Sequence, residues 1–274
     1  MKIDNDKYYT PVDLAKRLID KTYEIIGINN ITEKIEPSAG SGSFSNQIDN
    51  CIAYDLVPES ANIIQANFLE LDLDYKKGRL FIGNPPFGRA TSLAKQFYKK
   101  AVKYSDYIAF ILPVSQLNQN VELFDFDLIY SEDLGLIHYT DRELNCCFNI
   151  YKRPLNGLLN LKRKYEFKDI KMNVVSIGKG RNDKIPEKYD LAICSWGSIG
   201  KIALTEDQYS STIYIQIFND DLREEIIKFF KTINWLEHYK MISMPKLNLW
   251  QVYEQLLIKF PNLSWHLNKQ MVIL

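Results

Sequence analysis

A short apolar run that ends in two prolines constrains the fold of this chain more than any other feature. Residues 80–83 (LFIG) are typical of a buried strand, and the tetrapeptide Asn84-Pro85-Pro86-Phe87 follows them directly. Two successive prolines stiffen the turn and provide no backbone N–H groups. Open α/β sheets place their polar binding groups at the carboxyl ends of strands. We therefore expect an α/β sheet with a rigid polar turn at the end of this strand.

The same tetrapeptide can hold a planar ring through an exocyclic amino group. The Asn84 side chain and the Pro85 carbonyl can each accept one of the two amino hydrogens, which aims the nitrogen lone pair. Phe87 offers a flat apolar face for the ring. Because Asn-Pro-Pro is also an ordinary turn sequence, the neighbouring motifs must decide between the two interpretations.

A glycine-rich segment precedes this turn. Residues 36–44 (EPSAGSGSF) follow a predicted strand, and we expect them to lead into a helix. Gly40 and Gly42 allow a ligand to approach the backbone closely, and the helix start would offer free N–H groups. Phosphate is not the expected ligand, because the segment lacks the Gly-Lys-Ser/Thr of phosphate loops and the third glycine of dinucleotide sites. A second apolar run ends at Asp55, a position from which a carboxylate can bind ribose hydroxyls.

The order of these motifs resembles a known family, the S-adenosylmethionine-dependent amino-group methyltransferases of nucleic acid. The resemblance is carried by Tyr9, Thr10, residues 36–44, Asp55, residues 66–68 (ANF) and residues 84–87. Their order is similar to the gamma arrangement of the adenine-N6 DNA methyltransferases. The resemblance extends over residues 7–152 and implies a class I methyltransferase fold, a Rossmann-like, mostly parallel, doubly wound sheet.

The resemblance also implies a binding site for S-adenosylmethionine. The implied cofactor-binding residues are Tyr9, Thr10, Glu36, Ser38, Gly40, Gly42, Asp55, Asn67, Phe68 and Asn84. Among them, Glu36 would meet the ammonium group, Asp55 the ribose hydroxyls and Phe68 the face of the adenine. Asn67 departs from the family, in which an Asp usually accepts from the adenine amino group. An Asn carbonyl can accept the same hydrogen bond, so we expect weaker but intact binding. Thr10 is also well placed to be a helix N-cap.

The implied catalytic residues are Asn84, Pro85, Pro86 and Phe87, and the implied reaction is methyl transfer to the N6 amino group of an adenine flipped out of DNA. Cytosine N4 and RNA adenine present an amine to the same acceptors and stay open as substrates. A glutamine amide of a protein is a further alternative. From another class, the chain could be a catalytically silent, nucleic-acid-binding subunit of a methyltransferase complex. The recognition sequence and a restriction partner cannot be predicted.

Apolar runs alternate with helical or loop segments over the first part of the chain. We expect strands near residues 32–36, 51–55, 63–66, 79–83, 107–113, 127–131 and 145–151, and helices at 10–26 and 92–104. This alternation indicates a mostly parallel sheet with helices on both faces, whose last strands can include an antiparallel one. Residues 1–153 are therefore the predicted cofactor-binding catalytic domain. Residues 154–274 are predicted to be a basic segment and a target-recognition region in a small α+β appendage.

Charge is distributed unevenly along the chain, although the formal net charge is zero. Residues 151–190 carry eleven Lys or Arg against five Asp or Glu. A cluster of this kind can meet the phosphates of nucleic acid beside the cleft, although a solvated basic hairpin is the alternative. The predicted nucleic-acid contacts are Phe87, Lys152, Arg153, Lys162, Arg163, Lys164, Trp196 and Lys201. For Trp196, a place in the core is the more common outcome.

Cysteine and histidine usage indicates neither a metal site nor disulfides. The four cysteines show no paired metal spacing, and only three histidines occur. The beginning of the chain has no hydrophobic signal region, and no apolar stretch approaches 18 residues. We expect a soluble protein of the reducing cytoplasm that binds no metal and no membrane.

Overall fold

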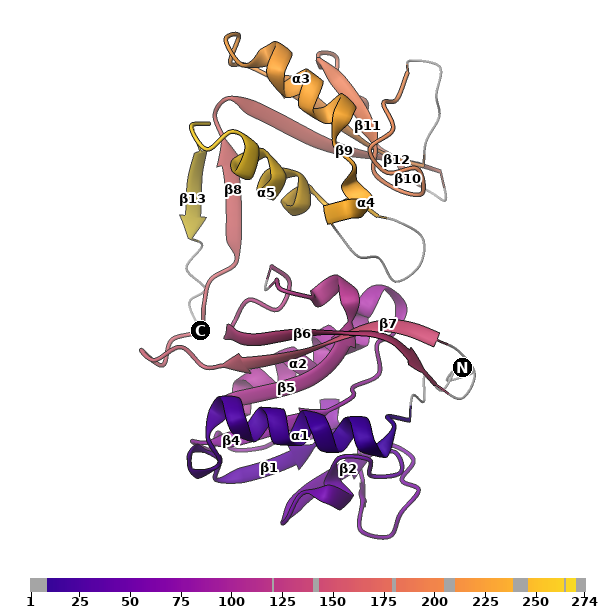
Figure 1. Cartoon of the computed structure of the whole chain (residues 1–274), viewed down its shortest axis with the longest axis vertical. Helices are drawn as coiled ribbons and strands as arrows, with labels where there is room; N and C mark the ends of the chain where they lie inside the picture. Colours follow the sequence, from indigo (N-terminus) through magenta and orange to yellow (C-terminus); the bar gives the residue numbers. More distant parts are fainter. Residues whose placement is uncertain are drawn as a thin grey trace. The chain divides into compact units, whose positions relative to one another are not determined.

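The structure, a computed structural model, describes residues 9–119, 121–139, 143–178, 181–204, 210–238, 246–263 and 265–269. Contacts divide the chain into two compact units, Met1–Lys162 and Arg163–Leu274 (Figure 1). The sequence placed this division earlier, between residues 153 and 154. The intervening segment is held to the first unit by Asn160, whose backbone N–H donates to the Asp125 carbonyl over 2.8 Å and whose side chain donates to the Asp127 carboxylate.

The first unit is built on a seven-stranded sheet with the order β3-β2-β1-β4-β5-β7-β6. Its strands are β1 (Glu33–Glu36), β2 (Cys51–Asp55), β3 (Ile64–Gln65), β4 (Arg79–Gly83), β5 (Tyr107–Pro113), β6 (Asp127–His138) and β7 (Glu143–Lys152). The strands β1 to β5 pair in parallel, and β7 is antiparallel to both of its neighbours. The predicted Rossmann-like, mostly parallel sheet with a late antiparallel strand is confirmed.

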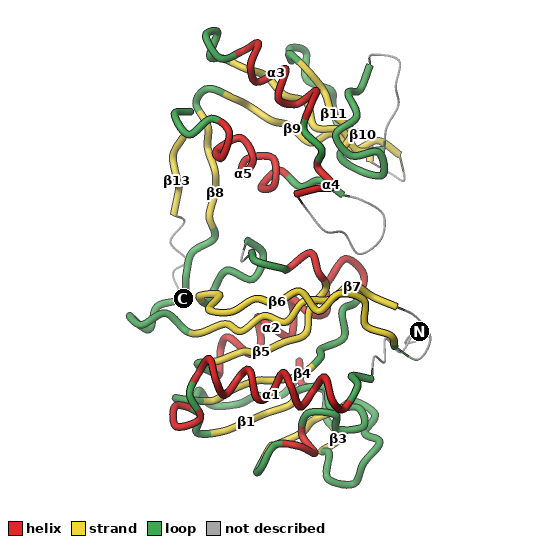
Figure 2. Tube along the Cα trace, viewed as in Figure 1, coloured by secondary structure: helices red, strands yellow, loops and turns green. Residues whose placement is uncertain are grey.

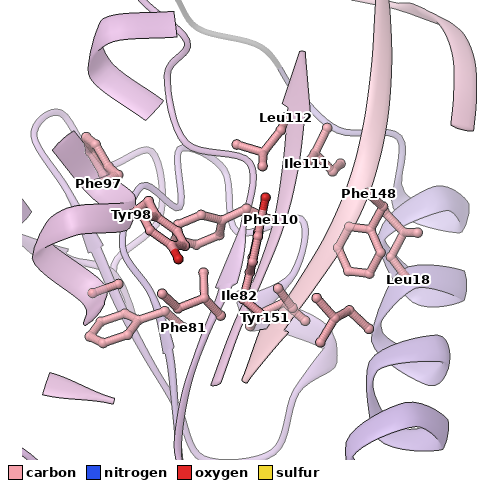
Figure 3. Close-up of a cluster of buried hydrophobic side chains, with 14 of the residues drawn as sticks. Leu18, Phe81, Ile82, Phe97, Tyr98, Phe110, Ile111, Leu112, Phe148 and Tyr151 are labelled. Carbon is pink, nitrogen blue, oxygen red and sulfur yellow. The ribbon is translucent and has the colours of Figure 1, made fainter. Parts of the chain in front are cut away.

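Two α-helices cover opposite faces of this sheet. The helix α1 (Val12–Ile26) buries Leu18 and Ile19, and α2 (Ser92–Tyr104) buries Phe97 and Tyr98. Figure 3 shows Leu18 on one side of the strands and Phe97 with Tyr98 on the other. Because both faces are covered, every residue of β4 and β5 is buried, and their interiors are continuously apolar. This packing explains why the sequence located these two strands at their observed bounds.

The antiparallel direction of β7 decides which residues share an edge of the sheet. Pro113, at the carboxyl end of β5, pairs with Cys146, whereas Lys152 pairs with Tyr107 at the amino end of β5. These two pairs are six residues apart, or about 20 Å at the rise of a strand. The end of β7 therefore lies at the edge opposite to the carboxyl ends of the parallel strands.

The predicted helix after the glycine-rich segment is wrong. Only a 3-10 turn, Ser45–Gln47, lies between β1 and β2, because β2 begins at Cys51 and leaves too few residues for an α-helix. The long helices of this unit are α1 and α2 (Figure 2). The other short 3-10 turns of the unit are Ile28–Asn30, Phe68–Glu70, Arg89–Thr91 and Val114–Gln116.

The second unit is an α+β structure, as predicted. A four-stranded sheet has the order β10-β9-β12-β11, and β13 pairs with β8 in a separate ribbon. Its elements are β8 (Arg163–Phe167), β9 (Ile170–Gly178), β10 (Arg181–Asn182), β11 (Leu191–Cys194), β12 (Ser211–Ile217), α3 (Arg223–Thr232), α4 (Trp235–His238), α5 (Leu249–Lys259) and β13 (Trp265–Lys269). Alternate residues of β12, such as Ile213 and Ile215, enter its core.

Within the described part of the chain, no helix combines the length and the apolar character that crossing a membrane requires. No group of three or more His, Cys, Asp or Glu side chains that could hold a metal ion is found among these residues either.

Candidate active site

A cavity of about 340 Å³ opens at the carboxyl ends of β1, β2 and β4. Its volume lies in the range of small-molecule sites. The position follows from the sheet, because parallel strands place their following loops at one edge. The lining residues are Tyr9, Thr10, Glu36, Pro37, Ser38, Ala39, Gly40, Ser43, Asp55, Leu56, Val57, Ala66, Asn67, Phe68, Leu69, Asn84, Pro86, Leu93 and Phe97.

The structure gathers the residues of the predicted cofactor site around this single cavity. Nine of the ten predicted residues line it, although they come from segments as distant as Tyr9 and Asn84. Gly42 is the exception. Its φ of 88° is in the left-handed region, and a Cβ there would meet the Asn46 side chain at 2.6 Å. Gly42 therefore shapes the turn that presents Gly40 to the cavity.

Asp55 is fixed by the glycine-rich turn. One carboxylate oxygen accepts from the Gly40 backbone N–H over 2.7 Å, and the other accepts from the Val57 N–H over 2.8 Å. Each oxygen keeps a second acceptor position. The carboxylate is thus oriented at the cavity wall while it can still accept from two further donors, as a pair of ribose hydroxyls requires.

Glu36 is the buried acid of the cavity. Its side chain is 2 % exposed and accepts from the Ser45 backbone N–H over 2.8 Å. Burial is the largest cause of its raised pKa, which reaches about 8, and the neighbouring Asp55 charge acts in the same direction. A cation that enters the cavity would favour the carboxylate form. This residue is therefore suited to an ammonium group.

Asn67 and Phe68 form the wall beyond β3. Phe68 is 1 % exposed, and its ring packs against Phe81 and Phe97 at centroid distances of 5.2 and 5.3 Å. Asn67 caps the following 3-10 turn, because its side-chain oxygen accepts from the Leu69 N–H over 3.1 Å. The sequence did not predict this capping role. It leaves the Asn67 oxygen one further acceptor position.

Asn84 is held by several segments at the end of β4. Its amide nitrogen donates to the Thr10 hydroxyl over 3.2 Å and to the Tyr139 hydroxyl over 3.4 Å. Its backbone carbonyl accepts from the Ser38 hydroxyl over 3.4 Å. The N-cap of α1 is Pro11, so the prediction that Thr10 caps this helix is wrong. The hydroxyl of Thr10 instead contacts the predicted catalytic turn.

The other residues of the turn have different environments. Pro86 lines the cavity, whereas Pro85 is buried. Phe87 is 6 % exposed, packs within the hydrophobic core and does not line the cavity. Its carbonyl accepts from the Leu93 N–H over 3.1 Å, which ties the turn to the start of α2. In this arrangement the Phe87 ring offers little open face, and stacking of a base on it stays a prediction.

Lys152 and Arg153 do not line the cavity, and their contact with nucleic acid stays a prediction. Lys152 is the last residue of β7 and Arg153 follows it, so both lie at the edge of the sheet opposite to Asn84, because β7 is antiparallel. Arg153 also makes contacts that stabilise the fold. It donates to the carbonyls of Val102 and Ser105 at the end of α2, and its guanidinium lies 3.2 Å from the Asp106 carboxylate.

The remaining residues that were predicted to contact nucleic acid lie at the end of the first unit or in the second unit. Lys162 is exposed, and Arg163 and Lys164 begin β8, but their side chains lie outside the described structure. Trp196 is 45 % exposed, so the expectation that it belongs to the core is wrong, whereas Trp235 is buried. Lys201 is exposed.

Two residues of this region were not identified from the sequence. Tyr139 follows β6 and is far from any motif, and only the sheet brings its hydroxyl to Asn84. Arg89 is an exposed cation two residues after Phe87. Its place two residues after the predicted catalytic turn was the signal that could have identified it, because cations beside such a turn can meet the phosphates of a nucleic acid.

Comparisons with known proteins give partial likenesses only. No model of a known protein family and no curated protein matches the chain. A candidate RNA methyltransferase from Pyrococcus horikoshii is similar over 54 % of this chain and 88 % of its own, with 17 % identity and a TM-score of 0.43. A candidate class I S-adenosylmethionine-dependent methyltransferase from Listeria monocytogenes covers 56 % of this chain and 64 % of its own, with 11 % identity and a TM-score of 0.40. A candidate methylase from Haemophilus influenzae covers 52 % and 99 %, with 14 % identity and a TM-score of 0.33.

Proposed function

We propose that this protein transfers a methyl group from S-adenosylmethionine to the N6 amino group of adenine in DNA. The observation that carries the proposal is the cavity itself. It collects nine of the ten residues that the methyltransferase resemblance assigns to the cofactor, and it ends at Asn84 of the catalytic turn. A catalytically silent subunit would need neither the complete cavity nor the turn beside it.

The cavity residues match the chemical groups of S-adenosylmethionine. When bound, the cofactor supplies an electrophilic methyl group on a sulfonium. Glu36 would hold the ammonium, Asp55 the ribose hydroxyls, and Phe68 the adenine ring. The carbonyl oxygen of Asn67 would accept from the adenine amino group while it caps its turn. Thr10 and Asn84, which also line the cavity, would then hold the methyl-bearing end.

Positioning and electrostatics would carry the catalysis. Asn84 and the Pro85 carbonyl accept the two hydrogens of the target amine, so its lone pair points toward the methyl group. An amine held in this way would accept the methyl group that the cofactor supplies, S-adenosylhomocysteine would be the leaving group, and the extra proton would pass to solvent. No residue forms a covalent intermediate, and no general base is required at this step.

The nucleic acid would reach the site as an extruded base, since a stacked base cannot expose its amine to Asn84. We propose Arg89 as a phosphate contact beside the catalytic turn, and Lys162, Arg163, Lys164, Trp196 and Lys201 as further contacts. All four cysteines are free, which suits the reducing cytoplasm, where we place the protein.

The test is a methylation assay with purified protein and labelled S-adenosylmethionine. DNA, RNA and protein pools are offered separately, and the modified nucleoside or residue is identified by mass spectrometry. We expect N6-methyladenine in DNA. Methylated RNA adenine, cytosine N4 or glutamine would replace the substrate assignment, and an absence of transfer to every pool would refute the enzymatic proposal.

Asn84→Ala tests the assignment of the catalytic turn in the same assay. We expect the rate to fall by roughly 100-fold or more, because one preorganised transition-state acceptor is lost. Affinity for S-adenosylhomocysteine should change little. Asn156→Ala, which alters an exposed residue of the first unit, is the matched control. Near-normal turnover of Asn84→Ala would remove this residue from the mechanism.

A further inference from the structure

Two hydroxyl groups from distant parts of the chain converge on one atom of the catalytic turn. The Asn84 amide nitrogen lies 3.2 Å from the Thr10 hydroxyl and 3.4 Å from the Tyr139 hydroxyl. Both partners are buried, with exposures of 5 % for Thr10 and 7 % for Tyr139. The Thr10 backbone carbonyl accepts in turn from the Ser43 hydroxyl over 2.9 Å. The amide is therefore surrounded by fixed groups.

The orientation of this amide matters for the proposed reaction. A side-chain amide has a donor end and an acceptor end, and only its oxygen can accept a hydrogen from a substrate amine. A rotation of the Asn84 amide by half a turn would place two N–H donors against the amine instead. In this structure the nitrogen lies on the side of Thr10 and Tyr139, and the oxygen is the opposite end of the amide.

We infer that Tyr139 and Thr10 are positioning residues that fix the Asn84 amide with its oxygen toward the target amine. The inference rests on the proposed function and adds Tyr139, a residue that no sequence motif indicated. Such preorganisation is effective because the acceptor needs no reorientation when the transition state forms.

The hairpin of β6 and β7 explains how Tyr139 reaches the site. Tyr139 follows the end of β6, and its ring belongs to the hydrophobic core of the first unit. Its hydroxyl also lies 3.7 Å from the Cys146 sulfur on β7. A phenylalanine would fill the same apolar space, so the hydroxyl is the part of Tyr139 that packing does not require.

The kinetic test compares Tyr139→Phe with the native protein in single-turnover methyl transfer. We expect a rate roughly 3- to 10-fold lower, the effect of one lost hydrogen bond, with unchanged dissociation constants for S-adenosylhomocysteine and DNA. Tyr130→Phe is the matched control, because its hydroxyl bonds only to Glu132 among the described residues, on the same strand β6. The control should keep the native rate.

A double variant separates positioning from a general structural effect. If Tyr139 acts through Asn84, then Tyr139→Phe should cause no further loss in an Asn84→Ala protein. The inference would be overturned if Tyr139→Phe lowered the rate of methyl transfer equally in the native protein and in the Asn84→Ala protein. A native rate for the single variant Tyr139→Phe would also overturn it.

A second readout does not depend on activity. The side-chain amide signals of Asn84 can be assigned by NMR from their absence in Asn84→Ala. Their hydrogen exchange should be slowed at least about tenfold relative to exposed Asn156, and Tyr139→Phe should reduce this protection. Fast exchange in the native protein would overturn the inference. If the native protein methylates nothing but shows this protection, the proposed function fails while the fixed amide stands.

Discussion

Asp55 illustrates how one residue can serve both the fold and the site. Its two carboxylate oxygens accept backbone N–H groups from Gly40 and Val57, so the acid organises the turns on either side of the cavity. Asp55 also lines the cavity, where we propose that it binds the ribose. Charge-assisted hydrogen bonds of this kind are stronger than neutral ones, which is why an amide is a poor substitute.

Asp55→Asn should therefore weaken cofactor binding without unfolding the protein. One oxygen is replaced by an N–H₂ group that cannot accept, and the charge is lost. We expect the dissociation constant of S-adenosylhomocysteine to rise about 10- to 100-fold in calorimetry. The exposed Asp49→Asn is the control and should bind normally. Equal affinity of both variants would move the ribose contact to another residue.

Glu36 should make cofactor binding depend on pH. Burial raises the pKa of this carboxyl to about 8, so below that pH it is mostly neutral in the free protein. An ammonium ligand requires the carboxylate, so binding at low pH must release a proton. Affinity for S-adenosylhomocysteine should thus rise with pH between 5.5 and 7.5, by up to about tenfold per pH unit.

Two controls identify Glu36 as the source of this dependence. Glu36→Gln should bind more weakly and show a flat profile over the same pH range. Adenosine, which lacks the ammonium, should bind the native protein with no comparable dependence. A flat profile for S-adenosylhomocysteine with the native protein would show that Glu36 does not meet the ammonium.

At the scale of elements, the end of β4 is packed tightly against β1. Gly83 has a φ of 149°, and a Cβ there would lie 3.2 Å from the Glu36 side chain. Gly135, in β6, also has a positive φ of 68°, but a Cβ there would meet nothing within 4 Å. Substituting alanine at each position in turn distinguishes two effects. Backbone strain is expected at both glycines, whereas a steric effect on the cavity is expected only at Gly83.

Gly83→Ala should accordingly disturb the site more than Gly135→Ala. Both substitutions place a side chain at a strained φ and should destabilise the protein by about 1 to 3 kcal/mol in denaturant unfolding. Only Gly83→Ala should also raise the dissociation constant of S-adenosylhomocysteine, because Glu36 must shift. If both variants bound equally well, contact with Gly83 would not matter for Glu36.

Arg153 connects the end of α2 with the end of β7. Its guanidinium donates to the Val102 and Ser105 carbonyls, which are left without helical partners at the end of α2, and it pairs with Asp106. We expect Arg153→Ala to lower the free energy of unfolding by about 2 to 4 kcal/mol, because buried acceptors lose a charged donor. The salt dependence of DNA binding should stay unchanged; a shallower dependence would restore Arg153 as a phosphate contact.

At the scale of the whole molecule, the basic stretch is divided between two roles and two units. Arg153 is structural, Lys152 lies at the edge of the sheet away from the cavity, and Arg163 and Lys164 start the second unit. Net charge cannot reveal this division, because the role of each basic residue depends on where the neighbouring strand ends.

Replacing Lys162, Arg163 and Lys164 together with Gln tests the remaining part of this stretch. Affinity for DNA should fall for all sequences, and the slope of log affinity against log salt should become shallower by roughly 0.7 to 0.9 per lost phosphate contact. Lys152→Gln is the control and should leave the slope unchanged. If the triple variant also kept the native slope, the phosphate contacts would have to be sought at Arg89 and Lys201.

The sequence by itself determined the parallel part of the sheet and placed Asp55 and Asn84 at its carboxyl edge, whereas the family resemblance implied most of the other predicted cavity residues. Residues such as Asp55 and Asn84 directly follow apolar strands, and the carboxyl ends of parallel strands meet at one edge. Local order along the chain was therefore enough to place them together. The same reasoning failed for the helix after Phe44, because it ignored how soon β2 begins.

Only the tertiary structure decided the features that depend on strand direction and long-range pairing. Because β7 runs antiparallel to β5, Lys152 lies at the edge of the sheet opposite to the cavity. The pairing of β7 with β6 brings Tyr139 to Asn84. The burial of Trp235, with Trp196 exposed, likewise depends on how segments distant in the chain pack together. Periodicity in a sequence indicates which face of an element is apolar, but partners and direction are set by packing between segments distant in the chain.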